Sequence, residues 1–152
     1  MKFEIDQSGK IEQTNKNTIL CISNDKWKAV LIKARTKRQI QEIFRRNGQS
    51  RNFILFTFSA GLSFLIEEMG KTGQVIIDQE YFGKEHIITK ILLEMLSKKV
   101  EVHFRRIGRK AMAHHRAYAV AIGKLKAHKI LKLEEILKKI KMTEVGKRLK
   151  DA

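Results

Sequence analysis

The chain has 152 residues, a formal net charge of +16 and 43% hydrophobic residues, with one Cys and no Pro. This length fits one domain, and the apolar content is too high for a disordered chain. A single Cys excludes a disulfide framework and a zinc site built from several Cys residues. No apolar run reaches the length of a transmembrane helix, and residues 1–10 carry two acids without an apolar stretch. We therefore expect no membrane span, no secretory signal and a cytoplasmic location.

The positive charge is concentrated in two stretches of the chain. Residues 33–51 hold seven Lys or Arg against one acid, and residues 103–152 hold fifteen against four. Basic surfaces of this kind bind polyanions through phosphate contacts and the release of counterions. A Lys-rich proteome would also give a high total charge, but it would not concentrate that charge in two stretches. The distribution favours nucleic acid, either DNA or RNA, as the partner.

The first half of the chain predicts an antiparallel meander followed by helices. Apolar–polar alternation over residues 3–6 and β-branched, apolar runs over 18–23 and 29–32 indicate three strands. A helix is expected over residues 36–46, with Thr36 as its N-cap. Residues 53–69 are strongly apolar, and their length favours a buried helix over a strand.

The second half predicts alternating strands and helices. Val75–Ile77 is apolar on both faces, as in a central strand, and is followed by Asp78. A further strand is expected over residues 100–104, and helices over 83–99, 111–125 and 130–140. The chain is thus predicted to form a single α/β domain, a mixed five-stranded sheet flanked by helices, over residues 1–128. A basic amphipathic helical extension is expected over 129–152.

Acidic residues stand at the ends of two predicted strands, where open sheets gather ligands. Asp6 ends the first strand, Asp78 ends the central strand, and Glu80 follows two residues later. Carboxylates that meet there are ligands for Mg²⁺ or Mn²⁺, and two metals bridged by such groups stabilise phosphoryl transfer. Each Asp alone equally suits a turn-capping role. The combination of both acids with a basic surface favours the metal site.

Two adjacent His residues, His114 and His115, lie in the first turn of the helix predicted over 111–125. A neutral imidazole in this position can bind a metal or accept a proton. The pair also suits a phosphate contact or a solvent-exposed position. Trp27 and Tyr81 are interpreted as packing residues at the edges of elements rather than as base-stacking residues.

Three short motifs and the order of elements resemble the ribonuclease H-like superfamily. The motifs are Asp6–Gly9 in the first hairpin, Asp78–Gly83 after the apolar strand, and Ile107–Gly108 leading to Ala113–His114 and Ala117–Tyr118. Over about residues 1–125, the chain is similar to the small RuvC-type Holliday junction resolvases and their prokaryotic relatives. The resemblance implies a ribonuclease H-like fold for the domain over 1–128.

The resemblance also implies a function, a metal-dependent endonuclease that cleaves structured nucleic acid, with branched DNA as the first expectation. Asp6 is then the central ligand of Mg²⁺ or Mn²⁺, and Asp78 and Glu80 complete the acidic side. His114 acts as a metal ligand or proton acceptor, with His115 as its substitute. The family places one or two acids or a His on its last helix, and residues 111–125 contain no acid. A non-catalytic nucleic-acid-binding protein of the same fold therefore stays open, as does a basic protein-interaction or ribosome-associated role.

Basic residues of the two charged stretches are the expected phosphate contacts. They are Lys37, Arg38, Arg45, Arg46, Arg105, Arg106, Arg109, Lys110 and Arg116. Resolvases of this type are often dimers, because two symmetric cuts need two sites. The apolar segment 53–69 is the candidate dimer surface.

Overall fold

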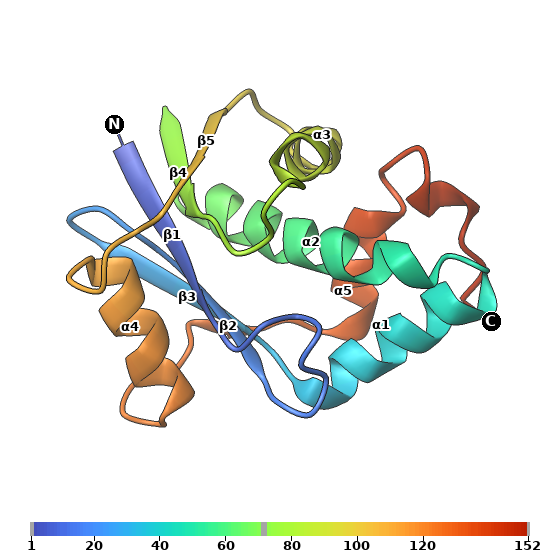
Figure 1. The fold of residues 1–152 in the computed structure, drawn as a ribbon, viewed down its shortest axis with the longest axis horizontal. Coiled ribbons are helices and arrows are strands. Elements are labelled where there is room, and N and C mark those ends of the chain that lie inside the picture. The colour runs from blue at the N-terminus through green and yellow to red at the C-terminus, as the bar shows by residue number, and fades with distance from the viewer. Residues whose placement is uncertain (1, 71–72, 152) are drawn as a thin grey trace.

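In the part of the chain that the structure describes, six strands form one mixed sheet in the order β5-β4-β1-β2-β3-β6. Figure 1 shows the strands β1 to β5 of this sheet. The computed structural model describes residues 2–70 and 73–151. β1, β2 and β3 form an antiparallel meander, β4 and β5 extend it in parallel on the β1 side, and β6 runs parallel to β3. The strands are β1 (Lys2–Ser8), β2 (Thr18–Ser23), β3 (Trp27–Ile32), β4 (Gln74–Asp78), β5 (Glu101–Arg105) and β6 (Lys129–Ile130).

Helices cover both faces of this sheet, in agreement with the predicted α/β class. α4 packs against one face of β1, β2 and β3, whereas α2 packs against the other face of β2 and β3. α1, α3 and α5 surround α2, and Figure 1 shows them on the side of the molecule away from α4. The helices are α1 (Ala34–Arg46), α2 (Phe53–Glu68), α3 (Glu85–Met95), α4 (Met112–Ala121) and α5 (Leu133–Ile140).

α2 is the central helix of the main core, which explains why it is apolar on all sides. The expectation of a helix over 53–69 is confirmed. Gly61 lets this helix approach β2 closely, because a Cβ there would lie 2.4 Å from Leu20 Cδ1. Most of α2 is buried within the chain itself, so the interpretation of this segment as a dimer surface is wrong.

The sheet has six strands, where the sequence predicted five. The additional strand, β6, falls at the point where a helix was expected to begin. Its backbone is held by hydrogen bonds from His128 N to Ala29 O and from Leu131 N to Leu31 O, both 2.9 Å. A strand of two residues is too short to show a period of two, so the pattern could not reveal it. α5 begins only at Leu133. Its N-cap residue is Lys132, whose N–H donates a hydrogen bond of 3.0 Å to Glu135 Oε1 in the first turn of the helix.

The chain after residue 128 contributes to the sheet through β6 and to the main core through Leu131, Ile136, Ile140 and Leu149. The division at residue 128 stays a prediction. α1 begins at Ala34 with Lys33 as its N-cap, so Thr36 lies inside the helix rather than at its start. None of the helices in the described residues combines the length and apolar character that crossing a membrane requires.

Candidate metal centre

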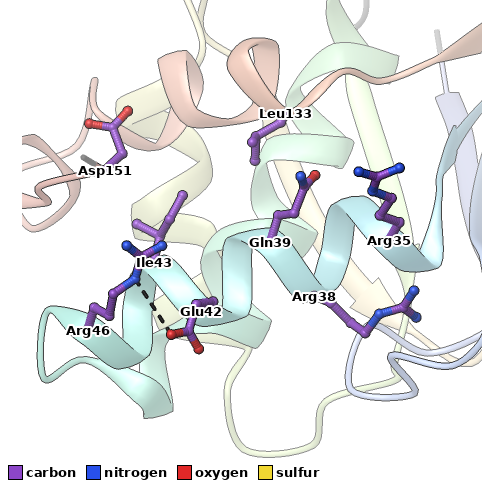
Figure 2. Close-up of a pocket in the computed structure, with 8 residues that line it drawn as sticks. All are labelled: Arg35, Arg38, Gln39, Glu42, Ile43, Arg46, Leu133 and Asp151. Atoms are coloured by element: carbon purple, nitrogen blue, oxygen red, sulfur yellow. Dashed lines mark ion pairs between the residues drawn. The ribbon is translucent and has the colours of Figure 1, made fainter.

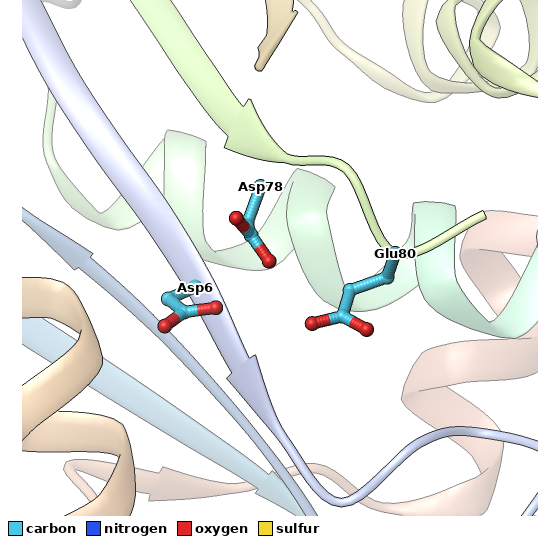
Figure 3. A group of neighbouring side chains, drawn as sticks. All are labelled: Asp6, Asp78 and Glu80. Carbon is cyan, nitrogen blue, oxygen red and sulfur yellow. The ribbon is translucent and has the colours of Figure 1, made fainter. Parts of the chain in front are cut away.

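The parallel pairing of β1 and β4 brings Asp6 and Asp78 together. Ile5 pairs with Ile77, so the two residues that follow them lie side by side near the carboxyl ends of the two strands. Glu80 joins them through a tight turn, in which its N–H donates to Asp78 O at 3.0 Å. Figure 3 shows the three carboxylates close together, one from β1 and two from the end of β4 and the loop after it. A carboxylate oxygen from each acid lies within 4.8 Å of the others, so the cluster can hold a metal ion.

Asp6 is the most enclosed of the three acids, with 4% of its surface exposed. Its Oδ1 accepts a hydrogen bond from Gln7 N at 2.8 Å, and its Oδ2 lies 2.7 Å from His114 Nδ1. Burial raises the pKa of Asp6 above its ordinary value, although both hydrogen bonds act in the opposite direction. The two hydrogen bonds fix the orientation of the carboxylate toward the cluster.

Burial raises the pKa of Glu80 to about 7, and hydrogen bonding to and repulsion from Asp78 add to the effect. The charge on Asp6 raises this pKa further, whereas the nearby Lys10 lowers it. The metal-free cluster thus retains a proton near neutral pH. A divalent cation favours the ionised carboxylates, so its binding releases this proton.

His114 is placed by α4, which packs across β1 and carries this side chain in its first turn. The cluster of acids that can hold a metal does not include His114. When Asp6 is ionised and the imidazole neutral, Nδ1–H donates to Asp6 and Nε2 is left as a proton acceptor. His115 is exposed on the adjacent position, its ring centroid 6.0 Å from that of His114.

The loop between β5 and α4, which is rich in basic residues, is hydrogen-bonded to Asp78 of the cluster. Asp78 Oδ1 accepts a hydrogen bond of 2.6 Å from the Ile107 N–H, in the loop between β5 and α4. Arg106, Arg109 and Lys110 extend from the same loop and are exposed. Arg105 lies opposite Asp78 in the register of β4 and β5, and its Nη2 lies 3.8 Å from Glu4 Oε2. Four of the basic residues expected to contact nucleic acid therefore lie in or beside the loop that holds Asp78.

Lys37 is not a surface residue, so its assignment as a phosphate contact is wrong. Its side chain is fully buried, and Nζ donates to Lys10 O, Gln13 O and Thr18 Oγ1 at 3.1, 2.7 and 2.9 Å. All three donors of the ammonium group are thus used inside the protein. Burial also lowers the pKa of Lys37 to about 8.

The remaining predicted contacts on α1 lie away from the acids. Arg45 and Arg46 pair with Glu42, and Arg38 Nη1 donates to Thr14 O at 2.8 Å. A pocket of about 390 Å³ lies along α1, and the three acids of the cluster do not line it. Figure 2 shows the residues that line this pocket. The pocket is lined by Arg35, Arg38, Gln39, Glu42, Ile43, Arg46, Leu133 and Asp151.

Arg116, on α4, is held by an aromatic side chain. Its guanidinium lies 5.3 Å from the ring centroid of Trp27, a cation–π contact. Two residues near the acids were missed as site residues by the sequence analysis, namely Lys10, beside Glu80, and Tyr81, which follows Glu80. Lys10 lies next to the motif Asp6–Gly9 and Tyr81 lies within Asp78–Gly83, but nothing in their spacing indicates the contacts they make.

Comparisons of the chain with protein-family models, with curated proteins and with solved structures find no match.

Proposed function

We propose that this protein is a divalent-metal-dependent endonuclease that acts on structured nucleic acid, with branched DNA as the first substrate class. The observation that carries the proposal is the cluster of Asp6, Asp78 and Glu80, whose oxygens lie within 4.8 Å of one another. Three clustered carboxylates repel one another, which is one reason why the pKa of Glu80 is raised.

The donor set fits Mg²⁺ or Mn²⁺. All three groups offer hard carboxylate oxygens, the ligands that these cations prefer, and the described residues add neither a thiolate nor an imidazole to the cluster. Asp78 and Glu80 lie on a strand end and the loop after it, whereas Asp6 lies within β1. The ion would therefore be held between two neighbouring parallel strands.

The topology supports a ribonuclease H-like fold. An antiparallel meander comes first, parallel strands β4 and β5 then extend it on the β1 side, and a late helix carries a residue to the first strand. This is the element order on which the resemblance to the superfamily rests. α4 contributes His114 where that family places one or two acids or a His, and in this protein the imidazole contacts Asp6.

The proposed chemistry divides among the residues as follows. Asp6, Asp78 and Glu80 would hold the cation, which would supply Lewis-acid activation of the phosphodiester and of the attacking water. His114 orients Asp6 through Nδ1 and accepts at Nε2 the proton that the attacking water loses, while the leaving oxygen takes its proton from solvent. Arg106, Arg109 and Lys110 bind phosphates near the cleaved bond, because the loop that carries them is hydrogen-bonded to Asp78.

Cleavage of a labelled panel tests this function. The panel holds duplex DNA, a four-way junction, an RNA–DNA hybrid and single strands, each with Mg²⁺, with Mn²⁺ and with EDTA. Asp6→Asn removes one charge from the cluster while keeping an oxygen that accepts from Gln7 N. Asp25→Asn, in the exposed turn between β2 and β3, is the matched control.

Metal-dependent cleavage that Asp6→Asn loses and Asp25→Asn retains is the expected result, with the junction cut fastest. Cleavage that survives EDTA or Asp6→Asn would contradict the proposal. Binding without cleavage by the wild-type protein would instead support a non-catalytic nucleic-acid-binding protein.

A further inference from the structure

The hydroxyl of Tyr81 joins the two loops that flank the acid cluster. It accepts hydrogen bonds from Ile11 N at 3.2 Å and from Gln7 Nε2 at 3.4 Å, and it donates to Glu12 Oε1 at 3.2 Å. A phenolic hydroxyl has one donor and two acceptor positions, so these contacts use its full capacity. The loop after β4 is thereby tied to the loop after β1.

The ring of Tyr81 anchors this connection in the core. It packs edge-on against Phe58 of α2, with ring centroids 5.0 Å apart, and Phe58 itself is 2% exposed. Tyr81 therefore links the core to both loops.

The loop between β1 and β2 is held from its other side by Lys37. The ammonium group binds Lys10 O and Gln13 O, which bracket the segment that Tyr81 contacts. Ile11, between them, is fully buried. Gly9 closes the loop with φ +78°, where a Cβ would lie 2.2 Å from Asn17 O. The loop is thus a fixed partner for Tyr81.

The hydrogen bond between Gln7 and Tyr81 joins the two residues that directly follow the proposed ligands Asp6 and Glu80 in the sequence. Gln7 follows Asp6 in β1, and Tyr81 follows Glu80. Glu80 is on a loop, and a loop ligand must be ordered by its surroundings before it binds a cation tightly. The Tyr81 hydroxyl provides this order, because it spans from the Glu80 loop to the strand that carries Asp6.

We propose that Tyr81 is a positioning residue for the acid cluster, which holds Glu80 beside Asp6 and thereby sets the affinity for the divalent cation. This inference rests on the metal site of the proposed function. It assigns to Tyr81 no contact with the cation or with nucleic acid.

The test compares Tyr81→Phe, which removes only the hydroxyl, with Tyr118→Phe, which alters an exposed Tyr on α4. The Mn²⁺ dissociation constant is measured by calorimetric titration with Mn²⁺ alone, far below the unfolding temperature. Hydrogen exchange of the Ile11 amide is measured on the metal-free proteins. Tyr81→Phe is expected to weaken Mn²⁺ binding about tenfold and to speed exchange at Ile11, whereas Tyr118→Phe changes neither.

Glu12→Ala provides a second variant in case Tyr81→Phe fails to fold, because Glu12 is exposed and is the acceptor of the Tyr81 hydroxyl. Weakening of Mn²⁺ binding in the same direction is expected. A lower unfolding temperature with unchanged Mn²⁺ affinity would assign Tyr81 a purely structural role and overturn the inference, as would unchanged exchange at Ile11. If the wild-type protein binds no Mn²⁺, the proposed metal site fails and this inference fails with it.

Discussion

Divalent-metal binding should depend on pH through Glu80. Burial and the neighbouring Asp78 hold the pKa of Glu80 at about 7, and only its ionised form is a good ligand. Because this pKa is raised, Glu80 is protonated in most metal-free molecules at pH 6 and ionised in most at pH 8. The apparent affinity is therefore expected to fall about tenfold from pH 8 to pH 6, with about 0.9 proton released per ion at pH 6 and about 0.1 at pH 8.

Calorimetry in pairs of buffers with different ionisation enthalpies measures both quantities at each pH. Glu80→Gln should bind the cation more weakly and lose most of the pH dependence, whereas Glu134→Gln, at an exposed position of α5, should behave as the wild-type protein. An affinity that is constant between pH 6 and pH 8, or a wild-type pH dependence that persists in Glu80→Gln, would refute the assignment of Glu80 as a ligand with a raised pKa.

Buried and charged groups also determine the stability of the protein and the salt dependence of nucleic-acid binding. Protonated Glu80 contributes stability that is fully present below its unfolded pKa of about 4.5 and is lost as the pH rises through 7. Glu80→Gln should therefore raise the unfolding free energy of the metal-free protein at pH 8 by about 1 kcal/mol, a figure reduced because Glu80 is partly exposed. A denaturation experiment at pH 8 that shows no gain in unfolding free energy would contradict this prediction. Lys37→Met should lower the unfolding free energy by about 2–4 kcal/mol, because three oxygens lose their hydrogen-bond donor. Lys16→Met, at an exposed position of the loop between β1 and β2 that Lys37 binds, should change it little. Equal urea midpoints for the two variants would count against the role of Lys37. Arg109→Ala should reduce the magnitude of the slope of log affinity for duplex DNA against log salt concentration by about 0.9. Lys26→Ala, in the exposed turn between β2 and β3, should leave this slope unchanged, and a slope that Arg109→Ala also leaves unchanged would place nucleic acid elsewhere.

Much of the fold could be predicted because its strands and helices have strong local patterns. The length of the apolar run over 53–69 distinguished a helix from a strand, and the doubly apolar Val75–Ile77 indicated a central strand, which β4 is. β6 could not be predicted, since it is defined by pairing with β3, a contact between segments about one hundred residues apart. The expected helix over 111–125 ends early, at Ala121, and Gly123 follows with a positive φ.

The position of Asp6 and Asp78 in the site could be predicted from the pairing of the strands that carry them. Parallel strands that lie next to each other bring their carboxyl ends together, so Asp6 and Asp78 converge once β1 and β4 pair. The contacts around them depend on side chains from distant segments, such as the Tyr81 hydroxyl on Ile11 N, and these have no local pattern. The burial of Lys37 did follow a local pattern, because this residue lies three residues before Ile40 and seven before Phe44, on the buried face of α1. Its charge alone suggested a surface position.

A crystal of the protein soaked with Mn²⁺ and measured at a wavelength with strong Mn anomalous scattering tests the central claim most directly. The account predicts an anomalous peak among Asp6, Asp78 and Glu80, about 2.1 Å from at least one oxygen of each acid. The same peak should be absent from Asp6→Asn crystals and present in Asp25→Asn crystals. A wild-type map without a peak at these acids would contradict the metal site and the nuclease function built on it.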